Sequence, residues 1–386
     1  MFNRWRVLEL RWPTRLNAGF IACCVVLVAG SLTAHSASFL ANGAGPQVDP
    51  LDGPFVMVGV PFAIGSNDIA LSDDGHTMIA VESRPVPWKM RRARVWDLAL
   101  GKATTGPLSP ASYFYGLSFD GRIAYTTDRD HICVWDVATS RLLWTKQFHL
   151  TGYGGIAMSR DGKQIAAASE ADNSVKVWQV GSDQPRLSIK QSDTATSVDF
   201  DRTGKRIATI SDGALQIYDA QTGEQAFPQF LPQSDWDLKH HFDLTGKRFL
   251  KLRDYGATVL DTTTGKTLLT IESKHNVGMV RWSVDSDKIV LVAMGEAAQI
   301  YDASTGKLDR TIASSDIRNL WIMPGSRWAV CQRDREPLEV WDLATGNKVQ
   351  TLTGSLHCDP DPVSSTLVTT NGEKLVKIWR LRSSFK

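Results

Sequence analysis

The sequence predicts an all-β fold, in which a unit of about 40 residues is repeated eight times and closes into a ring. Two observations lead to this prediction. A strand-like segment recurs at separations of 38 to 43 residues, and a tight turn precedes almost every copy. The reference positions of the eight copies are Trp96, Trp135, Trp178, Tyr218, Leu260, Tyr301, Trp341 and Trp379.

The recurring segment has the period of a β-strand. The residue before the reference position is always Val or Ile, the next one back is polar in seven copies, and the third is always apolar. This alternation predicts strands. An Asp follows the reference residue in six copies and Gly is fifth after it in five, as in "VWDLATGNK" at 340–348. Because Asp and Thr bond to local backbone and Gly supplies a positive φ, we interpret this stretch as a hairpin turn.

Another turn lies earlier in each unit, between two short apolar runs. Examples are "SDDGH", "SFDGR" and "SRDGK", which are typical of tight turns that join adjacent strands. With a weaker strand after the Thr-Gly turn, each unit holds four antiparallel strands. Four strands per repeat of this length indicate the blade of a β-propeller.

The segments "FDRTGKRIATISDGALQIYDAQTGE" and "MSRDGKQIAAASEADNSVKVWQV" resemble tryptophan-aspartate (WD) repeats, and the resemblance covers roughly residues 53–384. It implies a divergent propeller within the WD, YVTN and quinoprotein-like superfamily. The Gly-His dipeptide of WD repeats is absent, since no glycine precedes His149, His275 or His357. The Asp-His network of that family is therefore expected to be incomplete.

The number of blades follows from the ends of the repeat region. The last copy has no fourth strand after Trp379, whereas "PFVMVGVPF" at 54–62 is strand-like and precedes the first unit. We predict that this segment completes the last blade and closes an eight-bladed propeller. A seven-bladed ring with one detached unit is the alternative.

The N-terminus differs from the rest of the chain. Residues 1–17 are basic, and residues 18–34 form an uncharged apolar run that barely spans a hydrocarbon core at about 1.5 Å per residue. We expect a transmembrane signal anchor or the core of a signal peptide, then a linker at 35–52 and the propeller at 53–386. The arginines favour a propeller on the non-cytoplasmic side, periplasmic if the source is bacterial, or exported if the segment is cleaved.

Charge and cysteine content exclude several classes. The whole chain carries +2 and residues 1–17 carry +3, which leaves −1 for the remainder. A near-neutral propeller, expected to be monomeric, has no general attraction for nucleic acid. Cys133, Cys331 and Cys358 have no metal-ligand spacing, and a bond between Cys331 and Cys358 stays open.

No catalytic motif is present, so we expect no catalytic, cofactor-binding or metal-binding residues. The run "VWDVATSRLLWT" resembles the docking motif of quinoproteins, with Trp144 in the position of its tryptophan. A quinoprotein and a lactonase-like hydrolase are the enzymatic alternatives. A ligand or envelope sensor is a third class.

The favoured function is a non-catalytic scaffold that binds protein partners through loops on one rim. The first blade breaks the repeat, because "RPVPWKMRR" at 84–92 lengthens one of its loops. Trp and Arg are frequent at interface hot spots, so we expect contact with an acidic partner or anionic lipid headgroups. The candidate partner-binding residues are Trp88, Lys89, Arg91, Arg92, Tyr113, Tyr115, His149, Tyr153 and Trp236.

Overall fold

The computed structural model describes 55–57, 62–63, 68–81, 91–103, 106–111, 115–128, 130–150, 155–169, 171–227, 231–232, 241–312, 317–333, 337–352, 355–356, 366–370 and 375–381. Residues 50–386 form one compact unit. The expected basic segment, apolar run and linker lie outside the described residues. Within the described part of the chain, no helix has the length and apolar character needed to cross a membrane.

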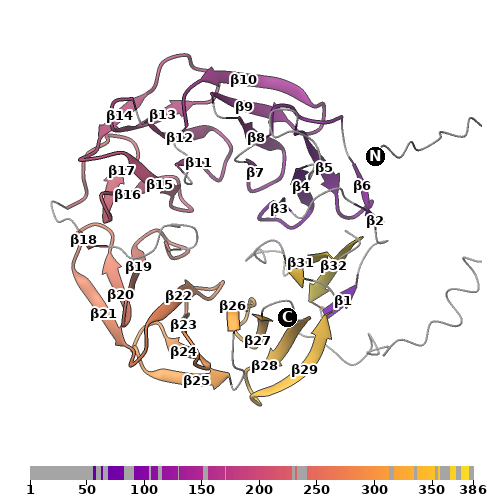
Figure 1. Ribbon diagram of the computed structural model, residues 1–386, viewed down its shortest axis with the longest axis vertical. Coiled ribbons are helices and arrows are strands. Elements are labelled where there is room, and N and C mark those ends of the chain that lie inside the picture. The colour runs from indigo at the N-terminus through magenta and orange to yellow at the C-terminus, as the bar shows by residue number, and fades with distance from the viewer. Residues whose placement is uncertain are drawn as a thin grey trace, which may run out of the picture. The chain divides into compact units, whose positions relative to one another are not determined.

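The described strands form eight antiparallel sheets, which are the blades of a ring (Figure 1). Blade 1 contains β3 (Asp68–Leu71), β4 (Thr77–Val81), β5 (Ala93–Asp97) and β6 (Lys102–Ala103). Blade 2 contains β7 (Tyr115–Leu117), β8 (Ile123–Thr127), β9 (His131–Asp136) and β10 (Arg141–Gln147). Blade 3 contains β11 (Ile156–Met158), β12 (Gln164–Ser169), β13 (Ser174–Gln179) and β14 (Leu187–Lys190). Blade 4 contains β15 (Ala195–Phe200), β16 (Arg206–Ser211), β17 (Ala214–Asp219) and β18 (Leu231–Pro232).

The second half of the ring repeats this arrangement. Blade 5 contains β19 (Arg248–Arg253), β20 (Gly256–Asp261) and β21 (Thr267–Glu272). Blade 6 contains β22 (Val277–Trp282), β23 (Lys288–Ala293), β24 (Ala298–Asp302) and β25 (Leu308–Ile312). Blade 7 contains β26 (Ile317–Ile322), β27 (Trp328–Arg333), β28 (Leu338–Asp342) and β29 (Asn347–Leu352). Blade 8 contains β30 (Ser355–Leu356), β31 (Thr366–Thr370) and β32 (Leu375–Leu381), together with β1 (Phe55–Met57) and β2 (Phe62–Ala63).

Blade 8 is completed by the start of the propeller region. β1 pairs with β32 from Phe55 opposite Leu381 to Met57 opposite Trp379, and β2 pairs with the same strand from Phe62 opposite Val376. The strand-like segment predicted at 54–62 therefore supplies the outer edge of the last blade, as expected. Blade 5 departs from the expected pattern: in its described part the innermost strand is reduced to a bridge between Phe242 and Phe249.

The hydrophobic core is divided among the contacts between blades. Each of the eight buried clusters is shared by two neighbouring blades. One cluster joins Ile69 and Met78 of blade 1 to Val368 and Ile378 of blade 8. Because every blade in the described part of the chain packs on two neighbours, the blades are contiguous around the ring.

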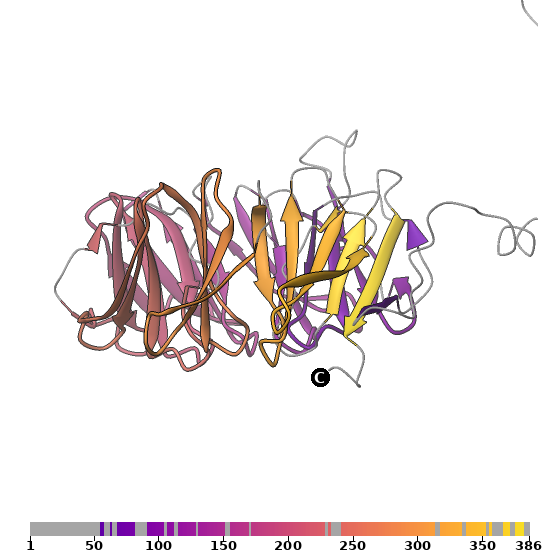
Figure 2. The ribbon, with the colours of Figure 1, turned by 90° about the horizontal axis from the view of Figure 1, so that it is seen from below.

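The ring has two rims, which are visible from the side in Figure 2. One rim carries the turns between the first and second strands and those between the third and fourth strands of each blade; we call it the turn rim. The other carries the loops between the second and third strands and the connections between blades; we call it the loop rim. The loop of blade 1 at 82–92 joins β4 to β5 and so belongs to the loop rim.

Candidate interaction surface

The turn in "VWDLATGNK" has a structural role. Asp342 Oδ1 accepts a hydrogen bond from the Ala344 backbone N–H at 2.8 Å, and the Gly346 N–H donates to the Asp342 carbonyl oxygen. Gly346 has a φ of 74°, a conformation that glycine adopts without strain. Val340 is fully buried. This geometry confirms that the repeated Asp-x-x-Thr-Gly pattern builds hairpins.

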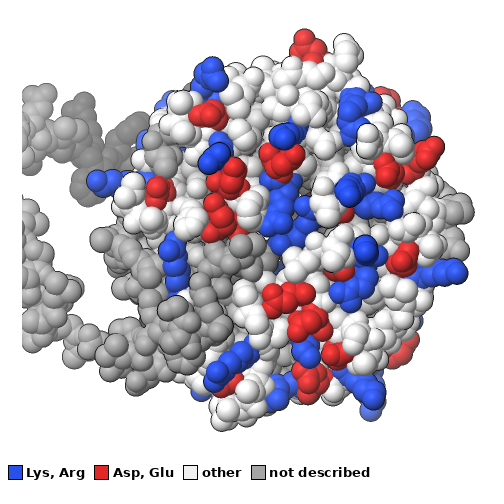
Figure 3. All heavy atoms as spheres, turned by 180° about the vertical axis from the view of Figure 1, so that it is seen from behind, with Lys and Arg blue, Asp and Glu red and all other residues white. Residues whose placement is uncertain are grey.

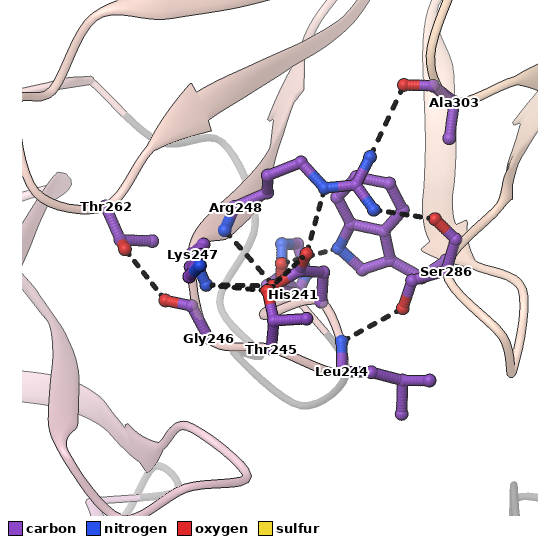
Figure 4. Close-up of polar contacts among 11 residues, drawn as sticks. His241, Leu244, Thr245, Gly246, Lys247, Arg248, Thr262, Ser286 and Ala303 are labelled. Carbon is purple, nitrogen blue, oxygen red and sulfur yellow. Dashed lines mark hydrogen bonds and ion pairs between the residues drawn. The ribbon is translucent and has the colours of Figure 1, made fainter.

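An extensive polar cluster joins blades 5 and 6 at the turn rim (Figure 4). The Asp243 carboxylate is buried and accepts hydrogen bonds from Arg248 Nε at 2.9 Å and from the backbone N–H groups of Lys247 and Arg248. The Arg248 guanidinium lies over the ring of Trp282 and donates to the Ser286 carbonyl oxygen at 2.8 Å. Trp282 Nε1 in turn donates to the carbonyl oxygen of His241. These bonds join blades 5 and 6, so we infer that the cluster stabilises the contact between the two blades.

The outer surface of the turn rim has mixed charge. Figure 3 shows basic side chains over the middle of this face, with acidic side chains among and around them. Arg160 occupies one of the first turns next to the ring axis, pairs with Asp73 of blade 1 at 3.1 Å and stacks on Phe119. On this rim an ion pair therefore joins blade 3 to blade 1 across the turn of blade 2 that carries Phe119.

Arg91 and Arg92 end the long loop of blade 1 on the loop rim. Arg92 is exposed, whereas Arg91 is half-buried. The Arg91 carbonyl oxygen accepts a hydrogen bond from the Ala111 N–H, and Ala93 pairs with Leu108 in both directions. The end of the loop is thus fixed to the segment that leads into blade 2, and it presents one guanidinium group to solvent.

Tyr115 and His149 occupy neighbouring parts of the same rim. Tyr115 begins β7, is half-buried, and packs on the cluster shared by blades 1 and 2. Its ring therefore supports the contact between the two blades beside the loop that ends in Arg91. His149 is exposed between β10 and β11, and its Nδ1 lies 2.9 Å from Asp130 Oδ1. His149 is thus held by blade 2.

The structure brings Arg91, Arg92 and Tyr115 to the junction of blades 1 and 2, and it places His149 on the connection between blades 2 and 3. The other five candidates, namely Trp88, Lys89, Tyr113, Tyr153 and Trp236, lie outside the described residues. Cys331 is a free, buried thiol, and Cys358 is also outside the described part, so the bond between them stays a prediction.

Trp144 lies where one blade docks on the next. It is buried in β10, its ring is 6.3 Å from that of Trp178 in blade 3, and its Nε1 donates to the Ser182 carbonyl oxygen at 3.1 Å. This is the contact that the docking-motif resemblance implies for that position. Among the described residues, no three His, Cys, Asp or Glu side chains are grouped so that they could hold a metal ion.

Sequence reasoning missed a second part of the loop rim, over blades 5 to 7. Tyr255 and Met294 are exposed at the tips of adjacent second-to-third-strand turns. A cleft of about 180 Å³ adjoins Met294 between blades 6 and 7. The signal was present in the sequence: an apolar or aromatic residue stands at the tip of a turn where apolar residues are usually scarce.

The fold and these contacts define a β-propeller built of four-stranded antiparallel blades. The family model described as outer membrane protein assembly factor BamB matches residues 89–234. This range includes Trp144 and its contact with blade 3.

Solved structures with the same fold cover most of the chain. The computationally designed Ika8 protein has a TM-score of 0.62 and 16% identity, covering 82% of this chain and 97% of its own. The C-terminal WD40 domain of Sif2 has a TM-score of 0.63 and 13% identity, covering 84% of this chain and 99% of its own. At such identities the likeness shows the fold alone. No curated protein sequence matches the chain.

Proposed function

We propose that the protein is a non-catalytic interaction scaffold that binds a partner protein through the loop rim. The carrying observation is the junction of blades 1 and 2, where the loop that breaks the repeat ends in Arg91 and Arg92. A backbone bond to Ala111 fixes this end of the loop. Because the backbone of Arg91 is already held in place, ordering this end of the loop on binding costs little conformational entropy, which favours a specific contact with an acidic surface.

The proposal includes a location outside the cytoplasm, anchored or exported by residues 18–34. Its support is the apolar run itself and the description of the partly matching family as an outer membrane protein assembly factor. A reporter enzyme that needs disulfide bonds, fused after Lys386, should be active in cells. An inactive reporter on the full-length chain, or equal activity with and without residues 1–34, would contradict this location.

The partner surface is tested by a charge reversal. We expect the variant Trp88→Ala, Arg91→Glu and Arg92→Glu of the full-length chain to lose its acidic partners in quantitative affinity purification. The matched control is Arg122→Glu with Lys163→Glu on the turn rim, where both side chains are largely exposed. Binding of the same variants to vesicles with and without anionic lipid separates a protein partner from a lipid surface. An unchanged partner set for the loop variant would overturn the proposal.

A further inference from the structure

Two exposed apolar side chains lie on turns whose backbone is held in place. Tyr255 is 57% exposed and Met294 is 70% exposed. The Tyr255 carbonyl oxygen accepts a hydrogen bond from the Ser273 N–H, and the Met294 N–H donates to the Asn276 carbonyl oxygen at 2.9 Å. Both turns are therefore bound to the segment 273–277 that connects blades 5 and 6. The side chains of Tyr255 and Met294 are therefore exposed although the backbone that carries them is ordered.

The cleft beside Met294 offers a place for an apolar side chain. Its walls include Met279 and Val292 of blade 6 and Ile317 of blade 7, and Met294 stands at its edge. With a volume of about 180 Å³, it has room for a single side chain of moderate size. Methionine adapts its shape to different apolar groups, and exposed Met and Tyr are frequent where proteins bind one another.

The two sides of the cleft carry opposite charges. Glu296 comes from the turn of blade 6, and its carboxylate lies 3.1 Å from His275 Nε2. Arg318 comes from the innermost strand of blade 7 and lines the opposite side. Complementary charges contribute to the choice of partner and to the orientation in which it binds. The occupant that fits is a segment with one charge of each sign around an apolar residue.

We propose that this cleft binds an extended segment of a partner protein, which inserts one aliphatic side chain between Met279, Met294 and Ile317. A basic residue of the segment faces Glu296 and an acidic residue faces Arg318. Tyr255 extends the contact along the rim toward blade 5. The inference rests on the proposed function, because it takes the loop rim as the binding face, and it adds a second contact remote from Arg91 and Arg92.

The test uses the full-length chain and an array of acetylated peptides. Each peptide presents a central Leu, Met or Ala, with Lys and Glu, Glu and Lys, or two Ser residues placed two positions before and two positions after it, because residues two apart share one face of an extended chain. We expect the strongest binding for Leu or Met flanked by charges of opposite sign in one of the two orders, weaker binding for the Ser peptides, and a loss of roughly tenfold or more for the Ala peptides. Fluorescence anisotropy with the best peptide then gives affinities for the variants.

Met294→Glu should weaken binding by at least about tenfold, since it places a charge at the apolar edge of the cleft. The matched control is Leu308→Glu, because Leu308 is also an exposed apolar residue but lies on the outer strand β25. Equal binding by all peptides, or equal effects of the two substitutions, would overturn the inference. If Met294→Glu is silent while the Arg91 and Arg92 variant loses partners, the proposed function stands and this cleft is excluded.

Discussion

Asp243 illustrates how single residues in this protein serve the contacts between blades. Its carboxylate holds the turn that precedes β19 and orients Arg248, whose guanidinium reaches Ser286 in the next blade. Other turn aspartates, such as Asp120, bond only within their own turn and are far more exposed. Asp243 is the first residue of its turn and Asp120 is the third residue of its own, so the same residue type has different energetic roles at these two positions.

This difference predicts unequal effects of alanine substitutions. Asp243→Ala leaves the Arg248 guanidinium and two backbone N–H groups without their acceptor, and it should lower the free energy of unfolding by about 2–4 kcal/mol. Asp120→Ala should cost about 1 kcal/mol or less, since water replaces its bonds. Denaturation in urea compares the two variants. Equal losses would contradict the inter-blade role of Asp243.

Trp144 provides a second residue-scale prediction. Trp144→Ala empties a buried contact between blades 2 and 3 and should cost about 3–5 kcal/mol. Trp144→Phe keeps an aromatic ring against Trp178 and loses the hydrogen bond to Ser182, so its cost should be about 1 kcal/mol. Chemical denaturation of both variants measures the difference. A large effect of Trp144→Phe would assign most of the contribution to the hydrogen bond.

At the scale of elements, the strands and turns were largely predictable from sequence, because the same local chemistry is repeated eight times. Alternation predicted the third strand of each unit, and the Asp-Gly and Thr-Gly turns predicted its hairpins. Turns without glycine keep the same geometry, as Ser286 shows with its φ of 58°. In the described part of blade 5, the bridge between Phe242 and Phe249 in place of a longer innermost strand was not predicted, because the local pattern does not specify how the chain enters a blade.

The clasp formed by β1 and β2 leads to an element-scale prediction. A chain that begins at residue 53 keeps both strands and should unfold at the same urea concentration as the full-length protein. A chain that begins at residue 64 exposes the edge of β32 and should be less stable and prone to associate through that edge. Denaturation and size-exclusion chromatography test both chains. Equal behaviour would show that ring closure does not depend on the clasp.

The repeated hairpin turns predict an acid-sensitive stability. The Thr139 hydroxyl lowers the pKa of Asp136, and the Ser304 and Thr305 hydroxyls lower the pKa of Asp302. A lowered folded-state pKa contributes stability above the unfolded value of about 3.9, and this contribution is lost as the pH falls further. Replacing both residues by Asn should therefore reduce the dependence of the urea midpoint on pH below about 4. An unchanged dependence would place the acid sensitivity elsewhere.

At the scale of the whole molecule, the division of the core makes the ring cooperative. Each buried cluster belongs to two blades, and the one shared by blades 8 and 1 leaves no free end. The residues of the candidate surface could not be predicted from sequence to the same extent as the fold, because they come from loops of different blades that meet only in the folded ring. Tyr255 and Met294 are separated by a full repeat in sequence, yet both turns bind the same segment at 273–277.

If unfolding of the ring is cooperative, a destabilising substitution in one blade should lower the stability of the other blades as well. Leu320 is fully buried between blades 6 and 7, so Leu320→Ala should cost about 2–5 kcal/mol. Hydrogen exchange of amides in β13, on a remote part of the ring, should then accelerate together with that of β27. Acceleration confined to blades 6 and 7 would show that the blades open independently.

The pairing of β1 with β32 also constrains how the protein is made. The first strand of the propeller to leave the ribosome has no partner until nearly the whole chain has been synthesised, because its partner is the last strand. A contact between such distant segments closes late in folding. If the chain crosses a membrane while it is synthesised, β1 stays unpaired after translocation until β32 has also crossed. The timing of translocation thus becomes part of the folding pathway.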